Sequence, residues 1–116
     1  KSQAEIMIQI KNFFKELPLN RDCEFFEDIL QQKGFKLERI ISFGQNTPEN
    51  EWYDQEQEEW VILLKGSATL VFEDKPGEIE LNPGDHLLIK AHQKHRVSRT
   101  DPDQPSFWLA IHFDTV

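Results

Sequence analysis

The chain has 116 residues, the length of one small domain. Thirteen Lys and Arg against 21 Asp and Glu residues give a formal net charge of −8, which disfavours binding to nucleic acid or to an anionic membrane surface. No apolar run approaches the roughly 20 residues of a membrane-spanning helix, and the single Cys23 cannot form an intrachain disulfide. We therefore expect a soluble protein of a reducing compartment, the cytoplasm.

The first 34 residues predict an N-terminal arm followed by one short helix. The arm, residues 1–20, is expected to pack on the body of the domain. Residues 22–33 carry apolar side chains at helical spacing, and Gly34 can end a helix. These apolar residues are Phe25, Phe26, Ile29 and Leu30. The predicted organisation is thus an arm and helix over 1–34 and a single all-β domain over 35–116.

After Gly34 the apolar period changes from that of a helix to that of a strand. Short strand-like runs then follow one another, separated by turn residues such as those of Asn82-Pro83-Gly84-Asp85. The predicted strands are 35–43, 59–65, 67–73, 78–81, 86–90, 95–100 and 106–113. Many short strands at this spacing indicate a β-sandwich or a β-barrel.

Two short motifs resemble those of the cupin superfamily. Glu59 is followed by six residues and then by Gly66, which is similar to the end of the first family motif. Gly84, in a Pro-Gly-Asp turn, is followed eleven positions later by His95, as in the second motif. The resemblance covers roughly residues 35–113. It implies a small jelly-roll barrel and, as in many cupins, a homodimer.

The sequence departs from the family pattern where metal ligands are expected. Cupins commonly have two His residues, one apart, three or four positions before the motif Glu. Here those positions hold Trp52 and Asp54, or Tyr53 and Gln55, depending on the spacing. Other positions of the second motif differ as well, so the resemblance implies the fold more strongly than a full metal site.

Strand alternation places Glu59 on the same face as Val61 and Leu63, where a buried carboxylate needs a partner. His95, from a later strand, is the expected neighbour. We predict a metal site inside the barrel, since imidazole and carboxylate together suit Fe, Mn, Ni, Zn or Cu. The predicted ligands are Asp54, Glu59, His95 and His112, with Gln55 as the alternative to Asp54.

A structural interpretation of the same residues stays open. Glu59 then forms an ion pair with one of three arginines, and His95 only hydrogen-bonds the backbone at the barrel rim. The arginines are Arg39, Arg96 and Arg99. Several aromatic residues are likewise either core or the lining of a ligand cavity. They are Trp52, Tyr53, Phe72, Trp108 and Phe113.

The opposite face of the strand 59–65 carries Trp60, Ile62 and Leu64, which water would not solvate well. The helix, the arm or a second subunit must cover them, and we expect a homodimer.

Three functions follow. The first is a metal-dependent oxygenase, isomerase or lyase acting on a small organic molecule. The second is a non-catalytic module that binds or senses a small molecule, and the third is a structural dimer. No nucleophile with an adjacent base stands out, because Cys23 lies on the predicted helix and Ser98 on the opposite strand face from His95.

Overall fold

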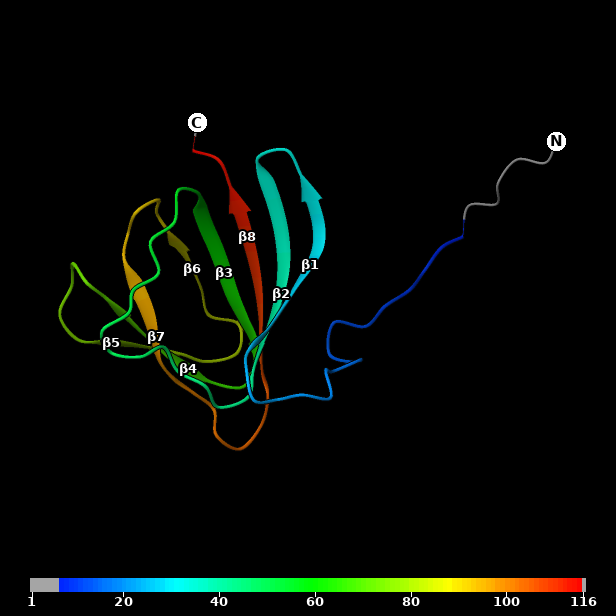
Figure 1. Cartoon of the computed structure of the whole chain (residues 1–116), viewed down its shortest axis with the longest axis horizontal. Helices are drawn as coiled ribbons and strands as arrows, with labels where there is room; N and C mark the ends of the chain where they lie inside the picture. Colours follow the sequence, from blue (N-terminus) through cyan, green and yellow to red (C-terminus); the bar gives the residue numbers. More distant parts are fainter. Residues whose placement is uncertain (1–6, 116) are drawn as a thin grey trace.

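The computed structural model describes residues 7–115, which form eight β-strands in two antiparallel sheets (Figure 1). The larger sheet has the order β1-β2-β8-β3-β6, and the smaller sheet has the order β5-β4-β7. Residues 7–115 contain no helix that is long and apolar enough to cross a bilayer. The strands are β1 (Phe25–Gln32), β2 (Phe35–Ser42), β3 (Glu58–Lys65), β4 (Ala68–Phe72), β5 (Glu78–Leu81), β6 (His86–Ile89), β7 (His95–Thr100) and β8 (Ser106–Phe113).

The hydrophobic core lies between the two sheets, so the architecture is the predicted all-β barrel. Val61, Leu63 and Trp108 enter the core from the larger sheet, and Leu70 and Phe72 enter it from the smaller one. The seven strands predicted from the alternating pattern are confirmed, each end to within one residue. Turn residues and period-two alternation predict these strands well, because the barrel buries one face of each strand and leaves the other less buried.

The predicted helix over residues 22–33 is wrong. Phe25–Gln32 form β1, an edge strand that pairs antiparallel with β2 through a tight hairpin, with Gly34 in the turn at φ 71°. The pairing register shifts between Asp28 and Leu30, which is a bulge at Ile29. The extra residue interrupts the alternation of β1, and the resulting apolar spacing resembles that of a helix.

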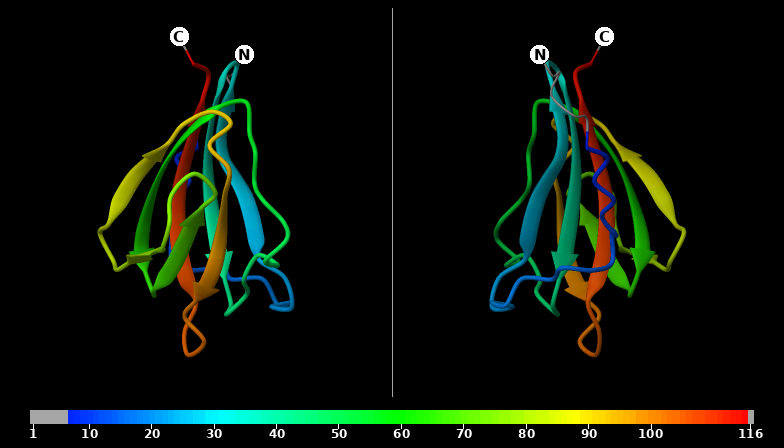
Figure 2. Two further views of the ribbon diagram at one scale, coloured as in Figure 1. Left: turned by 90° about the vertical axis from the view of Figure 1, so that its left-hand side faces the viewer. Right: turned by 90° about the vertical axis from the view of Figure 1, so that its right-hand side faces the viewer.

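The N-terminal arm lies on the outer side of the larger sheet (Figures 1 and 2), where Arg39 of β2 holds it by hydrogen bonds. The guanidinium donates to the carbonyl oxygens of Phe13 at 3.0 Å and Lys15 at 2.8 Å, and it pairs with Glu27. Next to it, the Phe14 ring packs edge-on against Phe107 of β8, with ring centroids 5.2 Å apart. The arm therefore covers part of this outer face, although Met7, Ile8 and Ile10 remain exposed.

Gly66 makes the turn from β3 to β4, where no side chain fits. Its φ is +89°, and a Cβ there would lie 2.7 Å from the Cα of Ser106, which is fully buried. The glycine that ends the first cupin-like motif is thus required by the backbone conformation of this turn.

We predict that Gly66→Ala lowers the free energy of unfolding by about 3 kcal/mol, because strain at positive φ adds to overpacking against backbone. The matched control is Gly77→Ala, at φ +86° with nothing within 4 Å of the added Cβ. Its cost is about 1 kcal/mol, from the positive φ alone. Urea denaturation of both variants measures the difference, and equal losses would contradict the prediction.

Candidate functional site

A cavity of about 230 Å³ lies inside the barrel. This volume suits a molecule smaller than a typical drug. Aliphatic side chains and Trp108 form much of the wall, and a set of ionisable and amide side chains joins them. The polar members are Glu24, Lys36, Glu38, Tyr53, Gln55, Glu59, His95 and His112.

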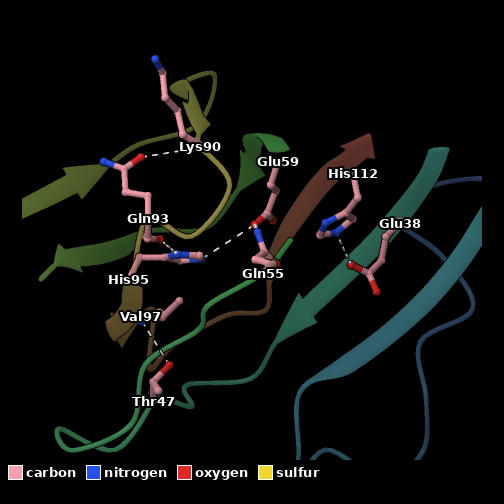
Figure 3. Close-up of polar contacts among 9 residues, drawn as sticks. All are labelled: Glu38, Thr47, Gln55, Glu59, Lys90, Gln93, His95, Val97 and His112. Atoms are coloured by element: carbon pink, nitrogen blue, oxygen red, sulfur yellow. Dashed lines mark hydrogen bonds and ion pairs between the residues drawn. The ribbon is translucent and has the colours of Figure 1, made fainter. Parts of the chain in front are cut away.

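Glu59 and His95 form a buried acid–base pair in this cavity (Figure 3). Glu59 points inward from β3, and His95 points inward from the start of β7 in the other sheet. Their relative exposures are only 7% and 6%. His95 Nε2 lies 3.8 Å from Glu59 Oε1, and the side-chain amide of Gln55 donates to the same oxygen at 2.8 Å. The carboxylate therefore has one firm hydrogen bond and one imidazole beside it.

The protonation of His95 is fixed by its other nitrogen. Nδ1 lies 2.9 Å from the carbonyl oxygen of Gln93, which can only accept, so Nδ1 carries the hydrogen. In the neutral ring Nε2 then carries a lone pair. Its distance of 3.8 Å from Glu59 Oε1 is too long for a hydrogen bond. The ring is held in place by Tyr53, which stacks on it with centroids 5.6 Å apart. His95 is thus held in one orientation, with Nε2 facing the Glu59 carboxylate.

A second imidazole–carboxylate pair borders the same cavity. His112 of β8 is the direct register partner of Glu59, and its Nε2 lies 3.1 Å from Glu38 Oε1 on β2. Lys36 Nζ lies 3.8 Å from the other oxygen of Glu38. Imidazole and carboxylate groups therefore alternate along the wall from β7 through β3 and β8 to β2.

Glu24, just before β1, adds a third carboxylate to the lining. It accepts a 2.5 Å hydrogen bond from the Ser42 hydroxyl, which in turn accepts from Trp108 Nε1 at 3.1 Å. Burial raises the pKa of Glu24 above its ordinary 4.5, and the Ser42 hydrogen bond lowers it in part. The pKa of Tyr53 is raised by burial first and then by the charge of Glu24, with Glu59 contributing. The Tyr53 hydroxyl therefore lies in the field of both carboxylates.

The structure brings together three of the four predicted ligands, Glu59, His95 and His112, and not the fourth. Asp54 is exposed and pairs with His92 at 2.8 Å outside the cavity. Gln55, the alternative, lines the cavity instead. Among the aromatic candidates, Tyr53 and Trp108 line it, whereas Trp52, Phe72 and Phe113 do not.

None of the three arginines partners Glu59. Arg39 holds the arm on the outer face, Arg96 lies over the Trp52 ring, and Arg99 donates to the Ser67 hydroxyl. The expectation that His95 bonds the backbone is met by its Nδ1, but its Nε2 faces Glu59.

Lys36, Glu38 and Glu24 are lining residues that the sequence interpretation missed. Lys36 and Glu38 alternate with Leu37 and Arg39, and the more polar set turned out to face the interior. The sequence held one indication of this orientation: Ile40, an apolar residue, shares a strand face with Lys36 and Glu38. Glu24 was missed because its segment was assigned to a helix.

The metal site that the family resemblance implies does not fit these residues. Within residues 7–115, no three His, Cys, Asp or Glu side chains are grouped as a metal centre requires. At the motif position that enters the cavity, Gln55 directs an N–H group at Glu59, which a cation would repel. Of the three predicted ligands in the cavity, Glu59 and His95 face each other, whereas His112 Nε2 is engaged by Glu38 at 3.1 Å.

The sequence pattern of the Cupin domain family matches residues 40–112. The chain belongs to the cupin family. This cupin is 42% identical to a protein from Ralstonia eutropha JMP134 that is provisionally named a mannose-6-phosphate isomerase. That match covers 92% of this chain and 99% of the other, with a TM-score of 0.88.

Two more distant structures share the fold of this cupin. A cupin superfamily protein from Desulfitobacterium hafniense DCB-2 is 17% identical, covers 85% of this chain and 84% of its own, and has a TM-score of 0.68. The DMSP lyase DddQ from Ruegeria pomeroyi DSS-3 is 21% identical, covers 73% and 41%, and has a TM-score of 0.60. No curated protein matches this cupin significantly.

We predict that Glu24→Gln changes how the stability of this cupin depends on pH. Because the folded state holds the Glu24 proton to a higher pH than the unfolded chain does, this carboxyl makes stability fall as pH rises above 4.5. Gln is neutral throughout, so the free energy of unfolding of the variant, relative to the unsubstituted protein, should rise as the pH increases above about 4.5.

Urea denaturation at several pH values measures this trend. Glu56→Gln, at an exposed position, is the control and should show no such trend. A pH-independent difference for Glu24→Gln would contradict the assignment.

Proposed function

We propose that this cupin binds a small organic molecule in the barrel cavity and transfers a proton to and from carbon, as isomerases and lyases do. The observation that carries the proposal is the free Nε2 of His95, which Gln93 fixes as a base at the cavity wall. A buried carboxylate 3.8 Å away stabilises the imidazolium that forms when the base takes a proton.

The reaction begins at a C–H bond next to a carbonyl group of the bound molecule. His95 Nε2 takes the proton, and the electron pair of the C–H bond moves into the carbonyl to give an enolate. Lys36 and Tyr53 are the nearby N–H and O–H groups available to a developing oxyanion. In an isomerase the proton returns to a different carbon or face, whereas in a lyase the electrons expel a leaving group. Neither route needs an oxidant.

The second pair, His112 with Glu38, supports proton transfer at another point of the same molecule. Two acid–base pairs in one cavity are what an isomerase needs when one group removes a proton and another delivers it. The provisional name of the Ralstonia relative also belongs to the isomerase class.

Metal-dependent catalysis stays a prediction that the side-chain geometry does not favour. Glu59 and His95 supply two donors, His112 Nε2 is engaged by Glu38, and Asp54 lies outside the cavity. The proton-transfer proposal therefore uses no metal step.

We predict that the protein catalyses exchange of carbon-bound hydrogen for deuterium in D₂O. The substrates for the test are small hydroxycarbonyl and aminocarbonyl compounds, and NMR detects the exchanged position. His95→Asn should reduce the exchange rate by at least about 100-fold, the range expected for loss of a general base. The exchange should persist after dialysis against EDTA, with elemental analysis confirming that metal is substoichiometric.

His92→Asn is the matched control, because His92 also pairs with a carboxylate but lies outside the cavity. It should retain full exchange. Exchange that is lost on EDTA treatment and restored by one metal would contradict the proposal and support the metal enzyme. Binding without exchange for every compound would support the non-catalytic binding module instead.

The outer face of the larger sheet supports the further proposal of a homodimer. Leu37, Ile111, Trp60 and Leu88 are successive register partners across β2, β8, β3 and β6, so they form an apolar row. The row is only partly buried within one chain, and Leu88 is 46% exposed. A second copy of the same face would exclude water from it.

We predict that Ile62→Asp, on this face, converts a dimer into a monomer, because a carboxylate would be desolvated at the interface. Sedimentation velocity measures the mass. Val71→Asp is the control, since Val71 is a partly buried apolar residue of β4 in the smaller sheet. A monomeric unsubstituted protein, or dissociation by both variants alike, would contradict the proposal.

A further inference from the structure

The cavity lining has more carboxylate and imidazole acceptors than free donors. His95 Nε2 accepts no hydrogen bond within residues 7–115, and Glu59 accepts only one, from Gln55. Of the donors that line the cavity, Trp108 Nε1 is used by Ser42 and the Gln55 amide by Glu59, which leaves the Tyr53 hydroxyl and the Lys36 ammonium. A ligand that fits Glu59 must bring a donor to it.

The charges of the cavity lining also favour a ligand that donates hydrogen bonds and carries positive charge. Three carboxylates, those of Glu24, Glu38 and Glu59, face one ammonium group, that of Lys36. Lys36 already lies 3.7 Å from Asp28 and 3.8 Å from Glu38. No arginine among the described residues lines the cavity. A phosphate or carboxylate group would therefore enter a negative field whose single ammonium group already lies between two carboxylates.

The gap between Glu59 and His95 is the place for a donor. Two acceptors 3.8 Å apart repel each other unless a hydrogen lies between them. An ammonium nitrogen beside Glu59 can donate to its carboxylate at ordinary hydrogen-bond distance and compensate its charge, while Nε2 of His95 stays available as the proposed base. Val61, Leu70 and Trp108 contribute apolar surface to the same cavity.

We propose that the cavity selects a small primary amine in its ammonium form, with a compact apolar body, and excludes phosphate esters and carboxylates. This inference rests on the proposed function, because it assumes that the cavity is the ligand site, and it adds the ligand class. It also separates this cupin from the phosphosugar in the provisional name of its Ralstonia relative.

The test uses four compounds with one carbon skeleton: cyclohexylamine, cyclohexanol, cyclohexanecarboxylate and cyclohexyl phosphate. Thermal unfolding and calorimetry of the full chain measure binding. The amine should raise the unfolding midpoint, since a ligand that prefers the folded state stabilises it. The two anions should leave the midpoint unchanged, and the alcohol should bind at least about tenfold more weakly than the amine.

Glu59→Gln should weaken amine binding by at least about tenfold, because it removes the buried charge. Glu73→Gln is the matched control, an exposed carboxylate that pairs with Lys94 outside the cavity, and it should bind as the unsubstituted protein does. If Glu59→Gln does not fold, NMR of the unsubstituted protein replaces it. The amine should then shift the Gln55 side-chain amide and the His95 ring resonances.

Tighter binding of the alcohol or of either anion than of the amine would overturn the inference. Deuterium exchange on a phosphorylated compound in the earlier experiment, with no amine binding, would overturn it while leaving proton transfer intact. Failure of every compound in both experiments would overturn both proposals. Amine binding without any exchange would support the ligand class and remove the catalytic step.

Discussion

A carboxylate buried inside a barrel constrains the rest of this site. Alternation along β3 places Glu59 beside Val61 and Leu63, where removal from water costs several kcal/mol. A hydrogen bond to a charged group returns roughly 1.5–3 kcal/mol, and Gln55 supplies one. Gln55 must therefore stay inside, and the loop that carries it is tied to β7 by paired backbone hydrogen bonds between Tyr53 and His95. The rest of the desolvation cost of the carboxylate must be offset by the imidazole of His95 and by the molecule that enters the cavity.

The barrel distributes polarity unusually between its two surfaces. The interior of the larger sheet carries Glu38, Glu59 and His112, whereas its outer surface carries apolar residues such as Trp60 and Ile111. The outer apolar row needs a cover, because water would not solvate it well. The arm held by Arg39 covers one part, and the proposed dimer contact would cover the rest. In that proposal, assembly and ligand binding use opposite faces of the same strands.

Membership of the cupin family establishes the fold and does not establish the reaction, because chemistry resides in the side chains placed on it. Here the first motif keeps its Glu and Gly but replaces both histidines, and the structure turns the remaining acid and base toward each other. The site therefore resembles a proton-transfer dyad more than a metal centre. The excess of carboxylates in the cavity lining also argues against assigning this cupin the phosphosugar substrate in the name of its relative.

The sequence by itself determined the strands β2 to β8, their turns, and the placement of Glu59 and His95 inside the barrel. These features depend on local alternation, on glycine at positive φ and on motif spacing, all of which are visible along the chain. Only the tertiary structure decided that residues 25–32 form a bulged edge strand, because pairing with β2 outweighs a spacing that looks helical. Only the tertiary structure chose Gln55 over Asp54 and joined His112 to Glu38. Those outcomes depend on the path of a loop and on the register between strands far apart in sequence, which no local pattern encodes.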